Sequence, residues 1–206
     1  MSEEVVARDA PLSGLGDSRD ELGSAHRKRR QEKTFRKILA AGVDTLRASS
    51  YAELTMRTVA AQAKVAPATA YSYFASKNHL FAEIYLDLIN QVPVFDNEND
   101  PALTRVTKTL RMLTLIVADE PEVAAACTTA LISDRDPAVQ EVADRIGVAI
   151  HRRISAALGA DAEPRRVAGL ELVFYGALVR AATGYLSYQK IADQLTFVVG
   201  SIIDDL

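Results

Sequence analysis

Apolar residues recur along this chain at the three- and four-residue spacing of amphipathic helices, and no segment alternates convincingly between apolar and polar positions. A first helix is expected at residues 31–48, where the apolar side chains would share one face. The same spacing predicts further helices at residues 56–63, 67–74, 77–92, 101–118, 121–132, 137–158, 164–188 and 190–204. The pattern therefore predicts an all-α protein of about nine helices.

Several of the later helices share one starting signal, an acidic residue followed by proline. The acidic side chain serves as a cap or interacts with the positive end of the helix dipole, and proline presets the backbone angle of the first turn. A helix is expected to start at each of four such pairs, Asp100–Pro101, Glu120–Pro121, Asp136–Pro137 and Glu163–Pro164.

The helix predicted at residues 164–188 is apolar around most of its circumference between Val167 and Leu186. A helix that is apolar all round has to be buried all round. We therefore expect one of its faces to pack inside the subunit and another to pack against a partner chain.

Charge is distributed unevenly along the sequence. Residues 1–25 have a net charge of −4, residues 26–77 a net charge of +8, and residues 78–206 a net charge of −7. We interpret residues 1–25 as a mostly disordered acidic tail, because they lack periodic apolar positions. A basic module fused to an acidic body is expected when only one end of a protein faces phosphate.

Two short helices at residues 56–63 and 67–74, joined by a tight turn and followed by a helix from Ser76, form a helix-turn-helix pattern. Ala70 and Phe74 would face the core, whereas Ala68, Thr69 and Ser72 would point outward, with Tyr71 on the flank. A small, polar outward face allows close approach to base edges in DNA. Lys77 lies at a helix N-terminus, which disfavours cations, and a phosphate bound there would offset the cost.

The segment from Thr55 to Phe81 resembles the DNA-binding domain of the tetracycline-repressor (TetR) family of bacterial transcriptional regulators. Its run of aromatic residues followed by Ser-Lys is more specific than a bare helix-turn-helix pattern. The residues that carry the resemblance are Thr55, Arg57, Val59, Ala60, Ala63, Val65, Thr69, Tyr71, Tyr73, Phe74, Ser76, Lys77, Leu80 and Phe81.

The resemblance implies which side chains meet DNA. Base-proximal positions fall on Arg57, Thr69 and Tyr71, phosphate-proximal positions on Thr55, Tyr73 and Lys77, and further contact positions on Pro67 and Ala68.

Two residues depart from the family pattern. Lys64 stands where glycine is common, so it adds positive charge near the DNA but costs roughly 1 kcal/mol if the turn keeps a positive φ. Ala66 stands where a capping serine or threonine is common, so one helix loses a cap.

The resemblance also implies a homodimer and an effector pocket. The helices at about residues 164–204 would form a four-helix dimer interface, and those between residues 77 and 188 would enclose the pocket. Ligand binding would then move the helix at residues 77–92 and change the spacing of the two recognition helices. The candidate pocket residues are Leu88, Phe95, Leu113, Val117, Cys127, Leu131, Ile146, Ile150, Glu171, Phe174, Tyr175 and Leu178. Most are apolar, so a lipophilic small-molecule effector is expected.

Other chemistry has little support. Cys127 is the only cysteine, which excludes an internal disulfide and indicates a reducing, cytoplasmic compartment. The histidines match no metal-binding spacing, and no glycine-rich phosphate loop is present. The longest apolar run is interrupted by Glu171 and Arg180, too short for a membrane span. We therefore expect no metal, no cofactor, no membrane contact and no enzymatic activity.

We expect a homodimeric, ligand-responsive bacterial transcription factor, with repression as the expected sign of regulation. Two other interpretations stay open. One is an architectural DNA-binding protein without an effector pocket, which a filled core would support. The other is an all-α enzyme or lipid carrier that happens to contain a helical hairpin. Loss of specific DNA binding with retained turnover or lipid transfer would support it.

Overall fold

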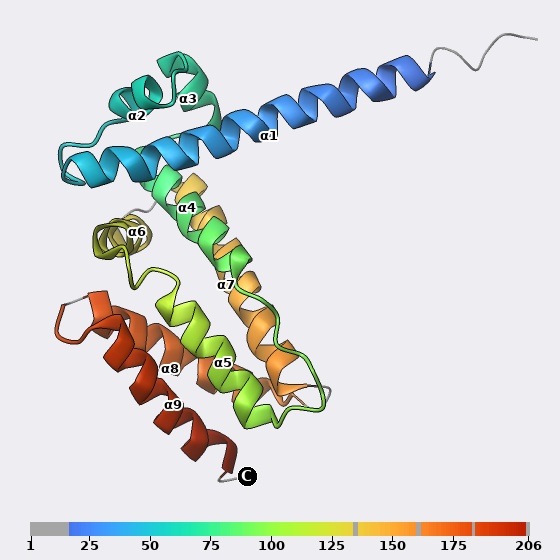
Figure 1. Ribbon diagram of the computed structural model, residues 1–206, viewed down its shortest axis with the longest axis vertical. Helices are drawn as coiled ribbons and strands as arrows, with labels where there is room; N and C mark the ends of the chain where they lie inside the picture. The colour runs from blue at the N-terminus through green and yellow to red at the C-terminus, as the bar shows by residue number, and fades with distance from the viewer. Residues whose placement is uncertain (1–16, 134–135, 160–161, 183, 205–206) are drawn as a thin grey trace, which may run out of the picture. The chain divides into compact units, whose positions relative to one another are not determined.

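The computed structural model describes residues 17–133, 136–159, 162–182 and 184–204, and all regular secondary structure within these ranges is helical. This confirms the all-α prediction. The helices, shown in chain order in Figure 1, are α1 (Asp17–Ala48), α2 (Met56–Gln62), α3 (Pro67–Tyr73), α4 (Lys77–Gln91), α5 (Ala102–Leu115), α6 (Pro121–Ser133), α7 (Pro137–Leu158), α8 (Pro164–Ala182) and α9 (Tyr188–Asp204).

Helix α1 begins at Asp17, well before the expected start at residue 31. Residues 17–25, assigned above to the acidic tail, belong to this helix, and the disorder of the tail stays a prediction. The rest of the predicted tail, residues 1–16, lies outside the described residues.

Contacts divide the chain into residues 1–37 and residues 38–206, and the division falls inside α1. The predicted boundary at residue 77 has no counterpart in that division and stays a prediction. In the first unit the basic stretch of α1 is solvent-exposed, and Arg36 Nε donates to Glu32 Oε1 at 2.8 Å.

In the second unit, α2 and α3 pack on each other. The contact is built from small and aromatic side chains with no exposed surface, including Val59, Ala60, Ala70 and Phe74. The C-terminal part of α1 approaches α4 closely at Gly42, where an added Cβ would lie 3.0 Å from Leu80 Cδ2.

The remaining helices form the body of the second unit. Helix α4 packs against α6 and α7, α5 packs against α7 and α9, and α8 packs against α7 and α9. Figure 1 shows α4 and α7 side by side, and α5 beside α8 and α9. The core side of α7 is an apolar stripe with helical spacing, formed by the buried residues Val139, Val142, Ile146, Ile150 and Ile154.

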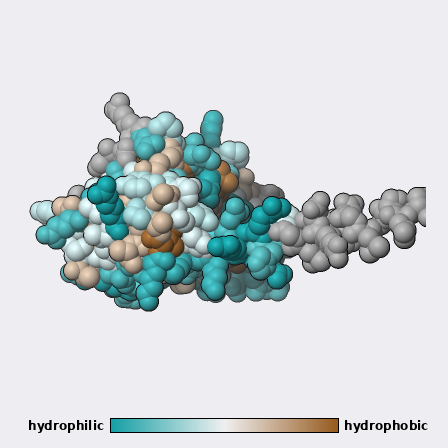
Figure 2. Space-filling view, turned by 90° about the horizontal axis from the view of Figure 1, so that it is seen from above, coloured by the Kyte–Doolittle hydropathy of each residue, from teal (hydrophilic) through white to brown (hydrophobic). Residues whose placement is uncertain are grey.

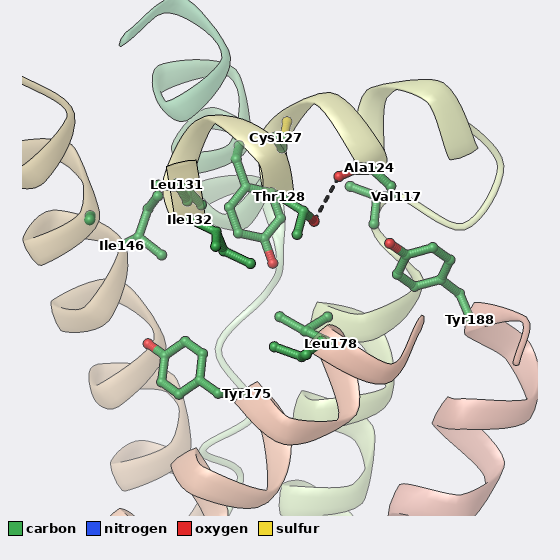
Figure 3. Close-up of a pocket in the computed structure, with 13 residues that line it drawn as sticks. Val117, Ala124, Cys127, Thr128, Leu131, Ile132, Ile146, Tyr175, Leu178 and Tyr188 are labelled. Carbon is green, nitrogen blue, oxygen red and sulfur yellow. Dashed lines mark hydrogen bonds between the residues drawn. The ribbon is translucent and has the colours of Figure 1, made fainter. Parts of the chain in front are cut away.

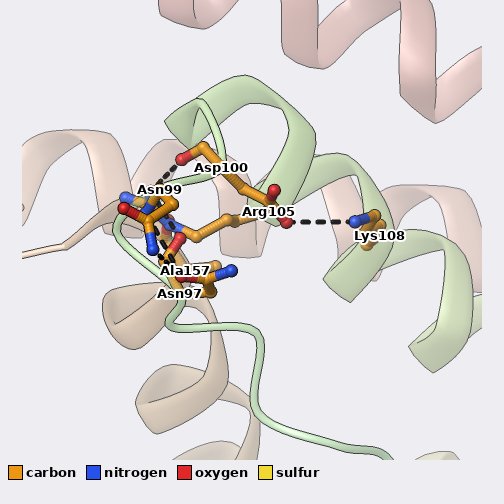
Figure 4. Close-up of polar contacts among 6 residues, drawn as sticks. All are labelled: Asn97, Asn99, Asp100, Arg105, Lys108 and Ala157. Atoms are coloured by element: carbon orange, nitrogen blue, oxygen red, sulfur yellow. Dashed lines mark hydrogen bonds and ion pairs between the residues drawn. The ribbon is translucent and has the colours of Figure 1, made fainter.

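Helices α6, α7 and α8 begin at the expected prolines, and α5 begins one residue after Pro101. Asp136 caps α7, since its Oδ1 accepts a hydrogen bond from the Ala138 N–H at 2.9 Å. Asp100 does not cap α5, where Pro101 occupies the cap position without a side-chain hydrogen bond. Instead the Asp100 carboxylate pairs with Lys108 Nζ at 3.1 Å, as Figure 4 shows.

A buried arginine, Arg105, binds the backbone of the segment that includes Asp100. Arg105 Nε donates to the Ala157 carbonyl at 2.8 Å, and its Nη1 donates to the Asp100 carbonyl (Figure 4). The Nη2 of Arg105 donates to the Leu158 carbonyl at 3.3 Å. Carbonyls at the C-terminal end of a helix favour a cation. Arg105 therefore fixes the loop between α4 and α5 to the end of α7.

Candidate nucleic-acid interface and ligand cavity

The start of α2 is fixed by a reciprocal cap. Thr55 Oγ1 accepts from the Thr58 N–H at 3.2 Å, and Thr58 Oγ1 accepts from the Thr55 N–H at 3.1 Å. Thr55 therefore caps α2, and such caps contribute about 1 kcal/mol. Thr55 and the nearby Arg57 are both exposed, so both side chains are accessible at the N-terminal end of α2.

The turn between α2 and α3 keeps the geometry that usually calls for glycine. Lys64 has a φ of 51° and is the only non-glycine residue with positive φ in the described part of the chain. A left-handed conformation costs a non-glycine residue roughly 1–2 kcal/mol. Ala66 provides no side-chain cap for α3, whose first residue is Pro67. Both expected departures are therefore present, and Lys64 adds an exposed cation beside α3.

Helix α3 presents a small, partly polar outward face. Ala70 and the following Phe74 are fully buried, whereas Ala68, Ser72 and Tyr71 are exposed, Tyr71 by 50%. These positions are those expected from helical spacing, whereas Thr69, which was also expected to point outward, is partly buried. Figure 2 views the end of the molecule that carries α2 and α3, where apolar side chains form only small patches within a hydrophilic surface. The outward face of α3 therefore has the size and polarity that base edges require.

Lys77 differs most from its expected role. Its Nζ donates to the carbonyl of Tyr51 at 2.7 Å and to that of Leu54 at 3.4 Å, and it lies 4.6 Å from the centre of the Tyr51 ring. The cation therefore points back to the loop before α2 rather than standing alone at its helix end. This geometry favours a role in holding that loop against α4 over direct phosphate contact.

We expect Lys77→Met to lower the free energy of unfolding by about 1–2 kcal/mol, because the two carbonyls lose a charged donor. The salt dependence of DNA binding should stay unchanged. Urea denaturation and binding at several salt concentrations measure both quantities, with Lys190→Met, an exposed lysine of α9, as the control. A salt slope lower by about one would restore the phosphate role.

A polar chain that the sequence did not reveal joins the end of α3 to α7. The Ala75 N–H donates to His79 Nδ1 at 3.1 Å, and His79 Nε2 lies 3.9 Å from Glu83 Oε1. Glu83 is buried and accepts from Arg145 Nη1 at 2.6 Å. The sequence spacing of His79 and Glu83 places them on one face of α4, but nothing in it identifies Arg145 as their partner.

An ion pair joins α1 to the turn between α5 and α6. Arg47 forms an ion pair with Glu120, and Arg47 Nε lies 3.2 Å from Glu120 Oε2. The hydrogen bond from Arg47 holds the pKa of the Glu120 carboxyl below its usual value. Both side chains are exposed enough that this pair orients the segments more than it stabilises the fold.

The body contains a cavity of about 210 Å³ between α4 and α6–α9 (Figure 3). Its wall is mainly apolar. It is formed by Tyr85, Val117, Ala124, Cys127, Thr128, Leu131, Ile132, Ala143, Ile146, Tyr175, Leu178, Val179 and Tyr188. Ile132 and Val179 are largely exposed, so the cavity reaches the surface beside them.

Six of the residues predicted for the pocket line this cavity: Val117, Cys127, Leu131, Ile146, Tyr175 and Leu178. Leu113, Ile150 and Phe174 lie elsewhere, fully buried in the core. Glu171 instead contacts His151, at 2.9 Å from its Nδ1, and Leu88 and Phe95 are partly exposed away from the wall.

Tyr85 and Tyr188 are wall residues that the sequence interpretation missed. Tyr85 lies in the apolar middle of α4, where a tyrosine hydroxyl is unusual, and that was the available signal. Tyr188 begins α9, a helix assigned above only to dimer formation.

Helices α8 and α9 leave apolar side chains uncovered. Leu172 is 74% exposed, and Val179, Phe197 and Val198 are also exposed. Leu172 and Val179 lie two helical turns apart on one face of α8, which ends at Ala182 rather than near residue 188. This outward surface, called the α8–α9 face below, matches the position predicted for a partner contact.

No helix in the described ranges combines the length and apolarity needed to cross a membrane. Within the same ranges, no group of three or more histidine, cysteine, aspartate or glutamate side chains is placed to hold a metal ion.

Sequence comparison identifies relatives of this chain. A family model described as bacterial regulatory proteins of the tetR family matches residues 38–84. An HTH-type transcriptional regulator of Mycobacterium tuberculosis is 60% identical over 178 residues, which cover 86% of this chain and 84% of that protein.

Solved structures share the fold at low identity. A TetR transcriptional regulator from Rhodococcus sp. RHA1 aligns with a TM-score of 0.72 and 20% identity, over 87% of this chain and 99% of the other. FadR of Thermus thermophilus, a TetR-family repressor in complex with lauroyl-CoA, aligns with a TM-score of 0.60 and 16% identity, over 80% and 92% of the two chains.

Proposed function

This chain belongs to the tetR family of bacterial regulatory proteins and is a transcriptional regulator, and from that premise we propose that it is a ligand-released repressor. In this proposal a homodimer binds a palindromic operator and leaves it when a lipophilic small molecule occupies the cavity. The observation that carries the DNA-binding part is the exposed, small and partly polar face of α3, held by a fully buried Ala70 and Phe74.

On DNA, α3 would enter the major groove, and two copies would read half-sites about 34–36 Å apart. Arg57, Thr69 and Tyr71 are the proposed base-proximal residues. Thr55 and Tyr73 are proposed to meet phosphate, and Lys64 is proposed to add attraction beside them. Regulators of this kind act where the chromosome is, so we propose a cytoplasmic location.

Helix α4 would carry the signal from the cavity to the DNA. Tyr85 of α4 lines the cavity, while His79 at the start of the same helix accepts a hydrogen bond from the Ala75 N–H just after α3. Glu83 lies between them and is bound by Arg145 of α7. A ligand that displaces α4 would therefore shift the end of the recognition helix, and in a dimer this changes the spacing of the two α3 helices.

The cavity also bears on the two other interpretations. An architectural protein requires no void, so a space of about 210 Å³ with a mainly apolar wall favours a ligand-responsive regulator. That FadR of Thermus thermophilus is a repressor in complex with lauroyl-CoA supports a lipophilic effector for this chain. An enzyme or lipid carrier gains no support from the relatives, which are transcriptional regulators.

The proposal is tested by measuring binding of the purified protein to the intergenic DNA upstream of its own gene. Fluorescence anisotropy with excess nonspecific competitor should reveal a saturable complex with two chains bound, and a scrambled fragment of equal length should not form it. If the operator lies elsewhere in the genome, genome-wide selection of bound DNA fragments should identify it. If that selection enriches no common palindrome, the protein is not an operator-binding repressor.

A further inference from the structure

The cavity combines an apolar wall with polar groups of one kind. Among the described residues that form its wall, none is charged, and three are tyrosines that come from three different helices: Tyr85 from α4, Tyr175 from α8 and Tyr188 from α9. Figure 3 shows Tyr175 and Tyr188 on opposite sides of Leu178. A ligand in the cavity would therefore meet phenol hydroxyls from more than one direction.

The other polar wall groups are already engaged. Thr128 Oγ1 donates to the Ala124 carbonyl at 2.8 Å, and Cys127 Sγ lies 3.4 Å from the Phe81 carbonyl. In contrast, the hydroxyls of Tyr85, Tyr175 and Tyr188 have no hydrogen-bond partner among the described residues. Tyr85 is the buried one of the three, and the hydroxyl of a buried tyrosine normally finds a partner. The missing partner fits a ligand that offers an accepting oxygen.

The electrostatic surroundings disfavour a charged ligand. Burial raises the pKa of Tyr85 and that of Cys127, so both groups stay neutral. Burial also raises the pKa of Tyr175, and the carboxylate of Glu171 raises it further, so this hydroxyl stays neutral as well. Because no residue of the wall is charged, an ion of either sign would lose its hydration without gaining a partner of opposite charge. That loss costs several-fold more than burying a neutral polar group.

The volume of the cavity limits the size of the ligand. An engineered apolar cavity of about 150 Å³ in another protein takes up benzene. A cavity of about 210 Å³ therefore suits one ring, or an apolar group of similar volume, with a small polar substituent. Tyr85 is buried and Tyr175 is partly exposed, so the ligand would run from the deep hydroxyl of Tyr85 toward the open side.

We propose that the cavity binds an electrically neutral, ring-sized apolar molecule with a hydrogen-bond-accepting oxygen, which accepts from at least one of the hydroxyls of Tyr85, Tyr175 and Tyr188. This inference rests on the proposed function in taking the cavity as the effector site. It specifies the ligand beyond that function, since it excludes carboxylates and other charged groups from the cavity itself.

Four probes of nearly equal shape test how the polarity and charge of a ligand affect its binding to the cavity. Acetophenone has a neutral accepting carbonyl, α-methylstyrene replaces that oxygen with a methylene group, benzoate carries a negative charge, and benzamidinium carries a positive charge. Their dissociation constants are measured by NMR titration of the full-length protein with ring-labelled tyrosine. Acetophenone should bind about three- to tenfold more tightly than α-methylstyrene, the usual effect of one neutral hydrogen bond. Benzoate and benzamidinium should bind more weakly than either.

Tyrosine-to-phenylalanine variants test whether the tyrosine hydroxyls cause the difference in affinity. The combined Tyr85→Phe, Tyr175→Phe and Tyr188→Phe variant keeps every ring, so it should fold, and it should remove the difference between acetophenone and α-methylstyrene. Tyr185→Phe is the matched control, because Tyr185 is 84% exposed and lies outside the cavity wall. The single variants then show which hydroxyls hold the carbonyl.

The inference is overturned if acetophenone and α-methylstyrene bind equally, if their difference survives in the combined variant, if either ion binds most tightly, or if no probe binds saturably. None of these measurements contains DNA. A protein that binds acetophenone through its tyrosines but recognises no operator would overturn the proposed function and leave the ligand class standing.

Discussion

Leu172→Glu is expected to convert the proposed homodimer into monomers and to weaken operator binding by more than about a hundredfold. Leu172 is 74% exposed on the α8–α9 face, so the carboxylate costs little in an isolated folded chain. In a two-fold interface the change occurs twice, and each buried, unpaired carboxylate costs several kcal/mol. Two linked half-site contacts gain about 10²–10⁴ in affinity over one, and a monomer loses that gain.

Val148→Glu provides the matched control for this experiment. Val148 is 69% exposed on α7, so the substitution adds the same charge at a similarly exposed apolar position outside the α8–α9 face. Sedimentation velocity and DNA anisotropy should show a normal dimer for Val148→Glu and a monomer for Leu172→Glu. If Leu172→Glu remains a dimer with unchanged operator affinity, the partner contact lies elsewhere on the chain.

The DNA-binding segment was predictable from sequence because its determinants are local. Thr55 caps α2 through a residue three positions away, and Ala70 and Phe74 are buried as helical spacing requires. Lys64 has the positive φ expected from its place in the turn. Each of these depends on neighbours within a few residues, which a sequence pattern contains.

The contacts that could not be predicted from sequence are those with residues distant along the chain. Lys77 looked like a lone cation at a helix end, but its partners are the carbonyls of Tyr51 and Leu54, more than twenty residues earlier. Asp100 looked like a cap, but Lys108 binds its carboxylate and Arg105 binds its carbonyl. Local sequence rules predict the contacts that a residue makes with its neighbours in the chain. A more favourable contact with a distant residue can replace them.

Sequence patterns also fail to distinguish the residues that line the cavity from their neighbours in the core. Ile146 lines it, whereas Ile150, one turn later on the same apolar stripe, is core. Tyr175 lines it, whereas the adjacent Phe174 is fully buried. Helical periodicity identifies the inward face, but the rotation of each helix about its axis decides which inward residues meet a void, and that rotation is set by packing across the whole body.

Tyr71→Ala is expected to weaken specific operator binding by about ten- to a hundredfold while leaving stability unchanged within about 0.5 kcal/mol. Tyr71 is 50% exposed on the outward side of α3, so its removal leaves no cavity in the fold. A base-proximal side chain contributes about 1–3 kcal/mol to discrimination, so nonspecific DNA should be affected much less than the operator.

Tyr185→Ala is the control for Tyr71→Ala, since it removes an equally large and still more exposed tyrosine from the turn between α8 and α9. Anisotropy against operator and scrambled DNA, with thermal denaturation of each variant, separates the effects. A uniform loss on both DNAs would assign Tyr71 to the phosphate backbone, because backbone contacts position a protein without reading sequence. Equal operator affinity for both variants would instead place base recognition on Arg57 and Thr69, and α3 would then approach the groove through its N-terminal end.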